Sequence, residues 1–162
     1  MALKSDRNEV QTDISFFMNE TATRGGIVSL SAGGSGAAMD QGAALATYTT
    51  ASGTQPLGIL LNDMVNLDLT RQHINQHKDE VQKGGKVTIL RKGYVVTSNL
   101  SCATAPTAGQ RAFVTHGGNI ANSGGLPDQT GNLQVGVFLS SMDQDNYAKV
   151  EINLPNQIAP SA

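Results

Sequence analysis

The amino-acid sequence predicts an all-β fold, arranged as a small antiparallel barrel or sandwich. Short apolar runs of strand length recur along the chain, separated by clusters of glycine, asparagine and aspartate. No stretch keeps the 3.6-residue period of an amphipathic helix. Only 15% of the residues are charged and 4% are aromatic, so valine, isoleucine and leucine must supply most of the core. These features together are typical of an all-β domain.

About eight segments carry a strand pattern. The clearest is 147–154, where every second residue is apolar and the residues between them are polar or charged. That alternation indicates a strand with one buried and one solvated face. Two strand patterns adjoin at residues 91–93, so residues 86–97 form either a hairpin or one bulged strand. The other segments are 27–30, 44–48, 56–61, 111–115 and 134–139.

Shifts in composition divide the chain into three parts. We expect an extended N-terminal arm over residues 1–24, a β-rich domain over 25–155 and a C-terminal tail over 156–162, which prolines mark as loose. Within the domain, residues 62–83 are the least strand-like and are mostly polar. They form either a long polar excursion or a short surface helix.

The arm is polar and charged apart from one apolar patch, which consists of Ile14, Phe16, Phe17 and Met18. A polar segment with one apolar anchor is either a tail that packs on its own domain or on a neighbouring subunit, or the first edge strand of its domain. A free arm can also add a strand to the sheet edge of a partner. We therefore expect these four residues to contact a partner, either another protein or the adjacent protomer.

Two apolar strands repeat one pattern 78 residues apart. In residues 57–64 and again in residues 135–142, the residue types follow the same order: apolar, Gly, β-branched, apolar, Leu, two polar residues and Met. A glycine inside a strand marks a bulge, a sharp bend or the close approach of another backbone. The repeated pattern indicates either pseudo-symmetric strands from an old duplication or a chance likeness between apolar strands.

The charge of the chain argues against a nucleic-acid partner, because the formal net charge is −2 and the Lys and Arg residues are scattered rather than clustered for binding phosphates. No run of 18 apolar residues is present, and the first residues lack the apolar stretch of a secretory signal. We therefore expect a soluble protein without a membrane partner. The single cysteine, Cys102, cannot form an internal disulfide, and its small apolar surroundings are more typical of a buried thiol than of a nucleophile.

His73 and His77 form the most catalytic-looking pattern. On a helix this spacing would place both on one face, near Asp79 and Glu80, as in a metal site. However, the metalloprotease pattern requires Glu directly after the first histidine, where this chain has Ile74. We therefore interpret the segment as a solvated polar loop.

The remaining candidate sites each lack a required residue. His116 stands beside two glycines, and no Gly-x-Ser-x-Gly elbow exists for a hydrolase. Asp143, Asp145 and Asn146 resemble half of a calcium loop, but the glycine and glutamate that complete such a loop are missing. A polar turn between two strands explains them better. We expect no catalytic residue, no metal and no cofactor.

Several segments resemble the head decoration (capsid cement) proteins of tailed, podovirus-like bacteriophages, and the likeness extends from about residue 6 to residue 154. The segments that carry it are DISFFMNE (13–20), PLGILLND (56–63), GGKVTILRKG (84–93) and DNYAKV (145–150). No single one of them is diagnostic, and the resemblance comes from their combination.

The resemblance implies a β-rich structural protein without catalytic residues that binds the outer surface of a capsid and stabilises it. It also implies the major capsid protein as partner, a homo-oligomer (trimer favoured, dimer possible), and a location on the virion, with the host cytoplasm as the site of assembly. Two alternatives remain: a receptor- or carbohydrate-binding β-module of a virion fibre, and a small hydrolase or metalloenzyme. The first would favour exposed aromatic side chains, yet the chain has three Tyr and no Trp.

Overall fold

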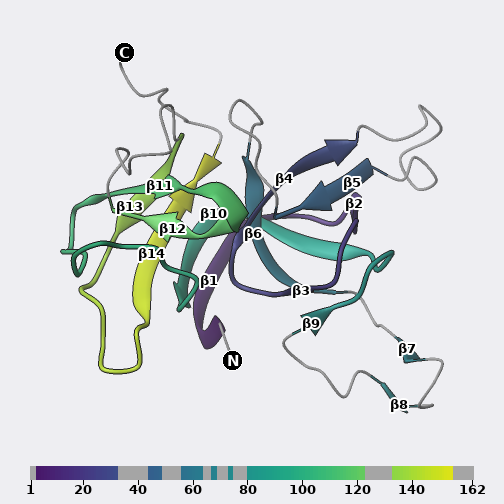
Figure 1. The fold of residues 1–162 in the computed structure, drawn as a ribbon, viewed down its shortest axis with the longest axis horizontal. Helices are drawn as coiled ribbons and strands as arrows, with labels where there is room; N and C mark the ends of the chain where they lie inside the picture. Colours follow the sequence, from purple (N-terminus) through teal and green to yellow (C-terminus); the bar gives the residue numbers. More distant parts are fainter. Residues whose placement is uncertain are drawn as a thin grey trace.

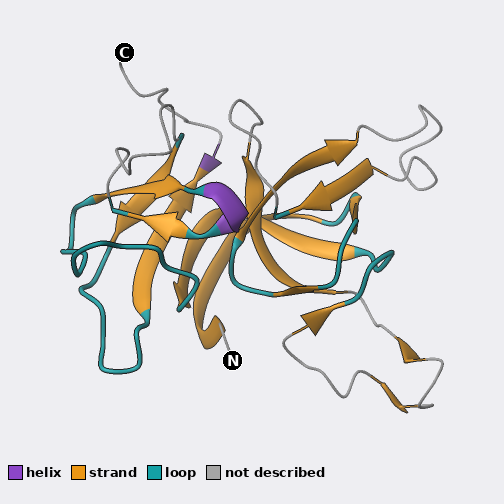
Figure 2. Ribbon diagram, viewed as in Figure 1, coloured by secondary structure: helices purple, strands orange, loops and turns teal. Residues whose placement is uncertain are grey.

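The computed structural model confirms the all-β prediction. Among the residues that it describes, the chain forms strands, turns and one short 3-10 turn, η1 (His116–Gly118) (Figure 2). The described residues are 3–32, 44–48, 56–63, 67–68, 73–74, 80–122 and 133–154.

The strands follow one another along the whole of the described chain (Figure 1). In order they are β1 (Leu3–Asp13), β2 (Phe16–Met18), β3 (Ala22–Thr23), β4 (Ile27–Ala32), β5 (Ala44–Thr47), β6 (Pro56–Asp63), β7 (Leu67–Asp68), β8 (His73–Ile74), β9 (Glu80–Val81), β10 (Val87–Thr97), β11 (Arg111–Val114), β12 (Ile120–Ala121), β13 (Gln134–Phe138) and β14 (Ala148–Asn153).

Ten of these strands form one sheet. Its order is β12-β11-β13-β14-β10-β6-β4-β5-β2, and β1 pairs with β10 beside this path. All neighbours are antiparallel except β2 and β5. The end strands β12 and β2 do not pair with each other, so the sheet stays open and folds over itself as a sandwich-like structure rather than a closed barrel. Figure 1 shows β11 to β14 on one side and β2, β4 and β5 on the other.

Strand β10 joins the two sides. Its first part, from Val87 to Leu90, pairs with β6, and its second part, from Lys92 to Thr97, pairs with β14. Strand β1 pairs along both parts. Residues 87–97 are therefore one long strand with an irregular middle, which is the bulged-strand alternative and not the hairpin.

Two clusters of buried side chains hold these layers together. The main core lies between the β10, β11, β13 and β14 side and the β4–β6 pair, and includes Ile27, Ile59 and Phe138. The second core lies on the opposite face of β4 and β6, with Val28 and Leu60 in it. Neighbouring residues of each strand thus enter opposite cores, Ile27 and Val28 in β4 and Ile59 and Leu60 in β6, which accounts for the apolar runs at these positions.

The chain contains two units with the same connectivity. In the first, β4, β5, β6 and β10 lie in the spatial order β5-β4-β6-β10, and in the second, β11 to β14 lie in the order β12-β11-β13-β14. All neighbours within each unit are antiparallel. We call these units the first half and the second half.

The two halves also agree in register. Gly58 of β6 pairs with Val28, and Gly136 of β13 pairs with Ala112, with a register shift at the next position in both cases. A side chain on either glycine would overlap a backbone carbonyl of the following strand, that of Leu90 or Glu151. The repeated sequence pattern around the two glycines therefore occupies equivalent places in two β units, and close backbone approach explains the glycine in each.

The polar segment 62–83 is an excursion in its described part. Strands β7 and β8 pair with each other, and β9 pairs with β3. The described residues of this segment include no helix. Figure 1 shows β7 and β8 set apart from the main sheet.

Candidate interaction surface

The N-terminal segment begins with a strand of the protein's own sheet. Strand β1 pairs antiparallel with β10 from Leu3 opposite Thr97 to Asp13 opposite Ile89. At residues 3–13 the segment is therefore the first edge strand, one of the two alternatives for it. The boundary at residue 24 between an arm and a domain stays a prediction.

Most of β1 contributes little to either core. Residues 5–12 are all exposed, whereas Leu3 at the start of the strand is buried in the main core. Val10 is 63% exposed, the largest value among the exposed large hydrophobic residues of the described chain. Sequence reasoning did not select Val10, because one valine within a polar segment carries no distinctive signal.

The four predicted contact residues have different environments. Ile14 is 45% exposed, Phe16 and Phe17 are half-buried, and Met18 is completely buried in the second core. Phe16 packs against that same core, and the Lys86 ammonium lies 5.9 Å from the centre of the Phe17 ring. The patch is thus divided between an exposed end at Ile14 and an internal end at Met18.

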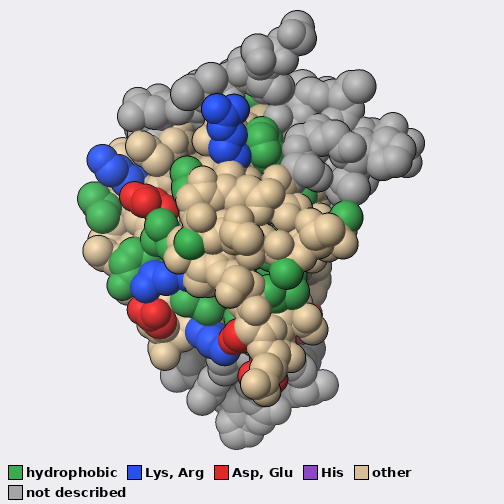
Figure 3. Space-filling view, turned by 90° about the vertical axis from the view of Figure 1, so that its left-hand side faces the viewer, with side chains coloured by type: hydrophobic (Ala, Val, Ile, Leu, Met, Phe, Trp, Pro, Cys, Tyr) green, Lys and Arg blue, Asp and Glu red, His purple; other side chains and the backbone are tan. Residues whose placement is uncertain are grey.

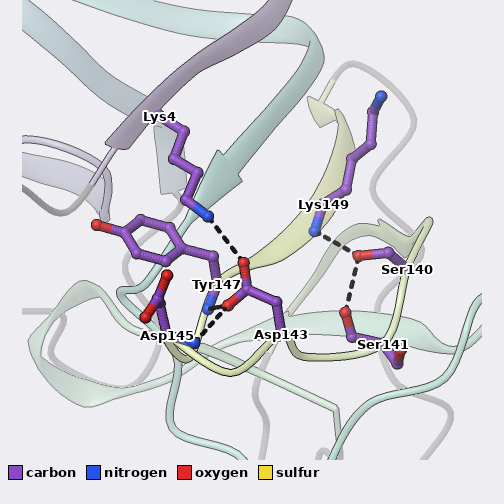
Figure 4. A network of polar contacts seen from close by, with 7 residues as sticks. All are labelled: Lys4, Ser140, Ser141, Asp143, Asp145, Tyr147 and Lys149. Carbon is purple, nitrogen blue, oxygen red and sulfur yellow. Dashed lines mark hydrogen bonds and ion pairs between the residues drawn. The ribbon is translucent and has the colours of Figure 1, made fainter.

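A polar contact fastens the start of β1 to the turn between β13 and β14 (Figure 4). Lys4 Nζ lies 2.8 Å from Asp143 Oδ2 and 4.2 Å from the centre of the Tyr147 ring. The other oxygen of Asp143 accepts hydrogen bonds from the backbone N–H groups of Asp145 and Tyr147. We call the pair Lys4 and Asp143 the clasp.

The clasp favours the charged form of both partners. The hydrogen bond from Lys4 lowers the pKa of the Asp143 carboxyl below its ordinary value, and the Tyr147 backbone N–H adds to the effect. The same hydrogen bond raises the pKa of Lys4. Because both side chains are exposed to water, the clasp orients β1 more than it stabilises the fold.

A second set of contacts lies beside the clasp. Lys149 Nζ is 3.4 Å from Asp6 Oδ2 and 3.9 Å from the centre of the Tyr94 ring. Figure 3 shows basic and acidic side chains close together on the side formed by β11, β13 and β14, with hydrophobic side chains between them. The described side chains of this face therefore have mixed charge and form no continuous basic surface.

Only part of the predicted histidine site lies within the described residues. His73 lies in β8, where the backbone is extended and Asp68 of β7 stands opposite, and not on a helix. Glu80 lies in β9, whereas His77 and Asp79 lie outside the described residues. His116 starts the short η1 turn. Where side chains are described, no three His, Cys, Asp or Glu residues gather into a metal-ligand cluster.

Asp143, Asp145 and Asn146 form a turn. Asp143 caps the turn with its carboxylate, and Asn146 adopts a positive φ of 63° and donates its N–H to the Asp143 carbonyl. Asparagine tolerates this backbone region better than most residues. The local hydrogen bonds confirm the interpretation of this segment as a polar turn.

Cys102 is half-buried, and its Sγ lies 3.7 Å from the Ile120 carbonyl. Burial raises the pKa of its thiol, which disfavours the reactive thiolate. The described residues include no helix that is long and apolar enough to cross a membrane.

Comparison with protein families decides the class of protein. Residues 8–153 match the family described as structural cement protein (E217 gp24/Pam3 gp6). The chain belongs to this phage structural cement protein family. No match was found among curated proteins. The match covers nearly all of the chain that the resemblance covers, and it confirms the prediction of a capsid cement protein.

Membership in the cement family gives the chain a structural, capsid-stabilising role and a place on the phage capsid. The open β sandwich has an exposed edge strand, exposed turns and a face of mixed charge. These features suit a protein that works by binding other proteins with its surface. The family suggests a non-enzymatic role.

Proposed function

We propose that this protein binds the outer surface of the assembled capsid as a homo-oligomer, with the major capsid protein as its partner, and joins neighbouring capsid subunits. The family match over residues 8–153 carries this proposal. A trimer is the favoured oligomer and a dimer the alternative. The protein has no catalytic function in this role, and assembly takes place in the host cytoplasm.

The N-terminal segment supplies the contact surface. Two of the four exposed large hydrophobic residues among those described, Val10 and Ile14, lie in this segment four positions apart. Full burial of an aliphatic side chain contributes about 1.5–3 kcal/mol. A small contribution per copy is sufficient, because contacts repeated over a lattice act together. Met18 in the second core and Phe16 packed against it support this surface from inside, and half-buried Phe17 lies between them in β2.

The proposal is tested by mixing purified protein with undecorated heads and measuring the amount that sediments with them. We expect saturable binding of the unmodified protein and weaker binding of Ile14→Ser. The matched control is Leu139→Ser, since Leu139 is 40% exposed and follows β13 directly, outside the N-terminal segment.

Circular dichroism of both variants shows whether they fold like the unmodified protein. Lack of binding by the unmodified protein would overturn the capsid role. Equal loss of binding in Ile14→Ser and Leu139→Ser would overturn the assignment of the contact to the N-terminal segment.

A further inference from the structure

We infer that β1 is exchanged between copies on the capsid, so that the β1 strand of one chain lies on the β10 edge of its neighbour. The interaction surface is the edge of β10 with the pocket that holds Leu3. The partner is the N-terminal strand of a second copy. This inference deepens the proposed function and rests on it.

The contacts of β1 are separable from the rest of the fold. Its side chains from residue 5 to residue 12 are exposed, and only Leu3 enters the main core. The remaining contacts are backbone pairing with β10 and the surface ion pairs of Lys4 and Asp6. Segments with few buried apolar contacts open at a lower free energy than the core does.

A short hinge connects β1 to a fixed point. Only Ile14 and Ser15 separate β1 from β2, and β2 is anchored by Met18, which is completely buried. The Ser15 N–H donates to Asp13 Oδ1 at 2.7 Å, which holds the present turn. Short hinges favour strand exchange, because extending them moves a whole element away from its own domain. An extended strand of this length reaches about 36 Å.

The free edge of β1 is less suited to a partner than the edge it already occupies. The pairing of β1 has register shifts between Leu3 and Arg7, and again on both sides of Gln11. Arg7 and Glu9 also form an ion pair on the strand, with Nε and Oε1 2.7 Å apart. Bulges and charged side chains discourage further strand addition at an edge. The edge of β10, which already pairs with a β1 strand, is therefore the surface better suited to the β1 strand of a second copy.

Exchange keeps the contacts that β1 makes with β10 and β14, and gives up the hydrogen bond from Ser15 to Asp13 within the hinge. The Leu3 pocket, the backbone pairing, the clasp and the Lys149–Asp6 pair are the same whether β1 comes from its own chain or from a second copy. The equilibrium between β1 paired within its own chain and β1 paired with a second copy therefore depends on the hinge and on the local concentration of neighbours. A capsid lattice raises that concentration, so exchange links copies without requiring a new interface.

Two single-cysteine variants test the exchange, both made in a Cys102→Ser background. One carries Asn8→Cys and the other Tyr94→Cys, since these residues stand opposite each other in β1 and β10. Facing Cα atoms in antiparallel strands are about 4.5–5.5 Å apart, within the usual disulfide range of about 4.4–6.8 Å. A tag on one variant lets a mixed dimer be separated from either homodimer on a non-reducing gel.

We expect a mixture of the two variants, bound to undecorated heads and then oxidised, to give the mixed disulfide dimer. The matched control pairs Asn8→Cys with Glu151→Cys. Glu151 faces Tyr94 from β14, which places it two strands from Asn8, about 9–10 Å away. That pair is expected to give no mixed dimer.

The outcomes separate the two proposals. Sedimentation with heads but no mixed dimer would overturn the exchange and leave the capsid role intact. Mixed dimers at equal yield in the test and control pairs would also overturn the exchange, since they would report random collision. Failure to sediment would overturn the capsid role and the exchange on the capsid together.

Discussion

The two halves of the molecule share one backbone plan but use it in different surroundings. In the first half both faces of the sheet are covered, with Ile59 in the main core and Leu60 in the second. In the second half Phe138, equivalent to Leu60, enters the main core, while Val137, equivalent to Ile59, is only partly buried between exposed Arg111 and Glu151. The same strand order thus serves as an inner layer and as an outer layer, and the side chains decide which.

The halves also differ in the connection between their last two strands. Residues 139–147 join β13 to β14 by a compact turn, whereas the connection from β6 to β10 spans residues 64–86 and contains β7, β8 and β9. In the second half, the last two strands are joined by a hydrogen-bonded turn whose Asp143 pairs with Lys4. In the first half, they are joined by a long polar excursion. The comparison teaches that the sheet plan is fixed and that the loops carry the variation.

The strongest test of the shared plan is the glycine in each half. A Cβ at position 136 would overlap the Glu151 carbonyl, and one at position 58 would overlap the Leu90 carbonyl. Because backbone atoms of a paired strand cannot move aside as a flexible side chain can, we expect Gly136→Ala and Gly58→Ala each to abolish most soluble folded protein. Circular dichroism and size-exclusion chromatography measure this loss.

The control for the glycine test is Gly84→Ala. Gly84 has a positive φ of 82° and no atom within 4 Å of an added Cβ. The expected cost is about 1–2 kcal/mol, from backbone conformation alone. Soluble, stable Gly136→Ala protein would show that the close approach between β13 and β14 is not required.

Core truncations compare the two halves quantitatively. We expect Phe138→Ala to lower the free energy of unfolding by about 3–5 kcal/mol and Leu60→Ala by about 2–5 kcal/mol. Since β10 of the first half pairs directly with β14 of the second half, both variants should still unfold in a single transition, measured by urea denaturation with two spectroscopic probes. Separate transitions for the two probes would show that the halves fold independently.

The smallest expected effect concerns the clasp, which joins Lys4 of β1 to Asp143 in the second half. The folded-state pKa of Asp143 lies below its ordinary value of 3.8, so its contribution is fully present above that value. It is lost as the pH falls through the folded pKa. We expect Asp143→Asn to remove this part of the pH dependence and to increase hydrogen exchange at the start of β1 near neutral pH.

The control for the clasp is Asp145→Asn, since Asp145 lies in the same turn without pairing to Lys4 through a hydrogen bond. Equal protection of β1 in Asp143→Asn and the unmodified protein would show that the clasp does not hold the strand.

Alternation and turn residues were enough to predict the strands that bury a face. The segment 147–154 contains β14, and the apolar runs around Gly58 and Gly136 contain β6 and β13. For β1, the sequence does not distinguish an arm from an edge strand, because residues 5–12 are polar and exposed. Its extended state comes from pairing with β10, which local sequence does not reveal.

The sequence marks an apolar patch at residues 14–18 but does not predict its burial in detail. Four neighbouring hydrophobic residues give no indication of which of them face inward. Tertiary packing decides this, since β2 inserts Met18 into the second core and leaves Ile14 outside. The family match, and no arrangement of side chains, carries the capsid role.

The pairing of β1 with β10 also sets an order in time. Leu3 is made before its partner Thr97, which follows 94 positions later. At roughly 5–20 residues per second, the ribosome completes that stretch in about 5–19 s. During that interval β1 of every nascent chain has no partner strand, so this edge of the sheet closes only after β10 has been made.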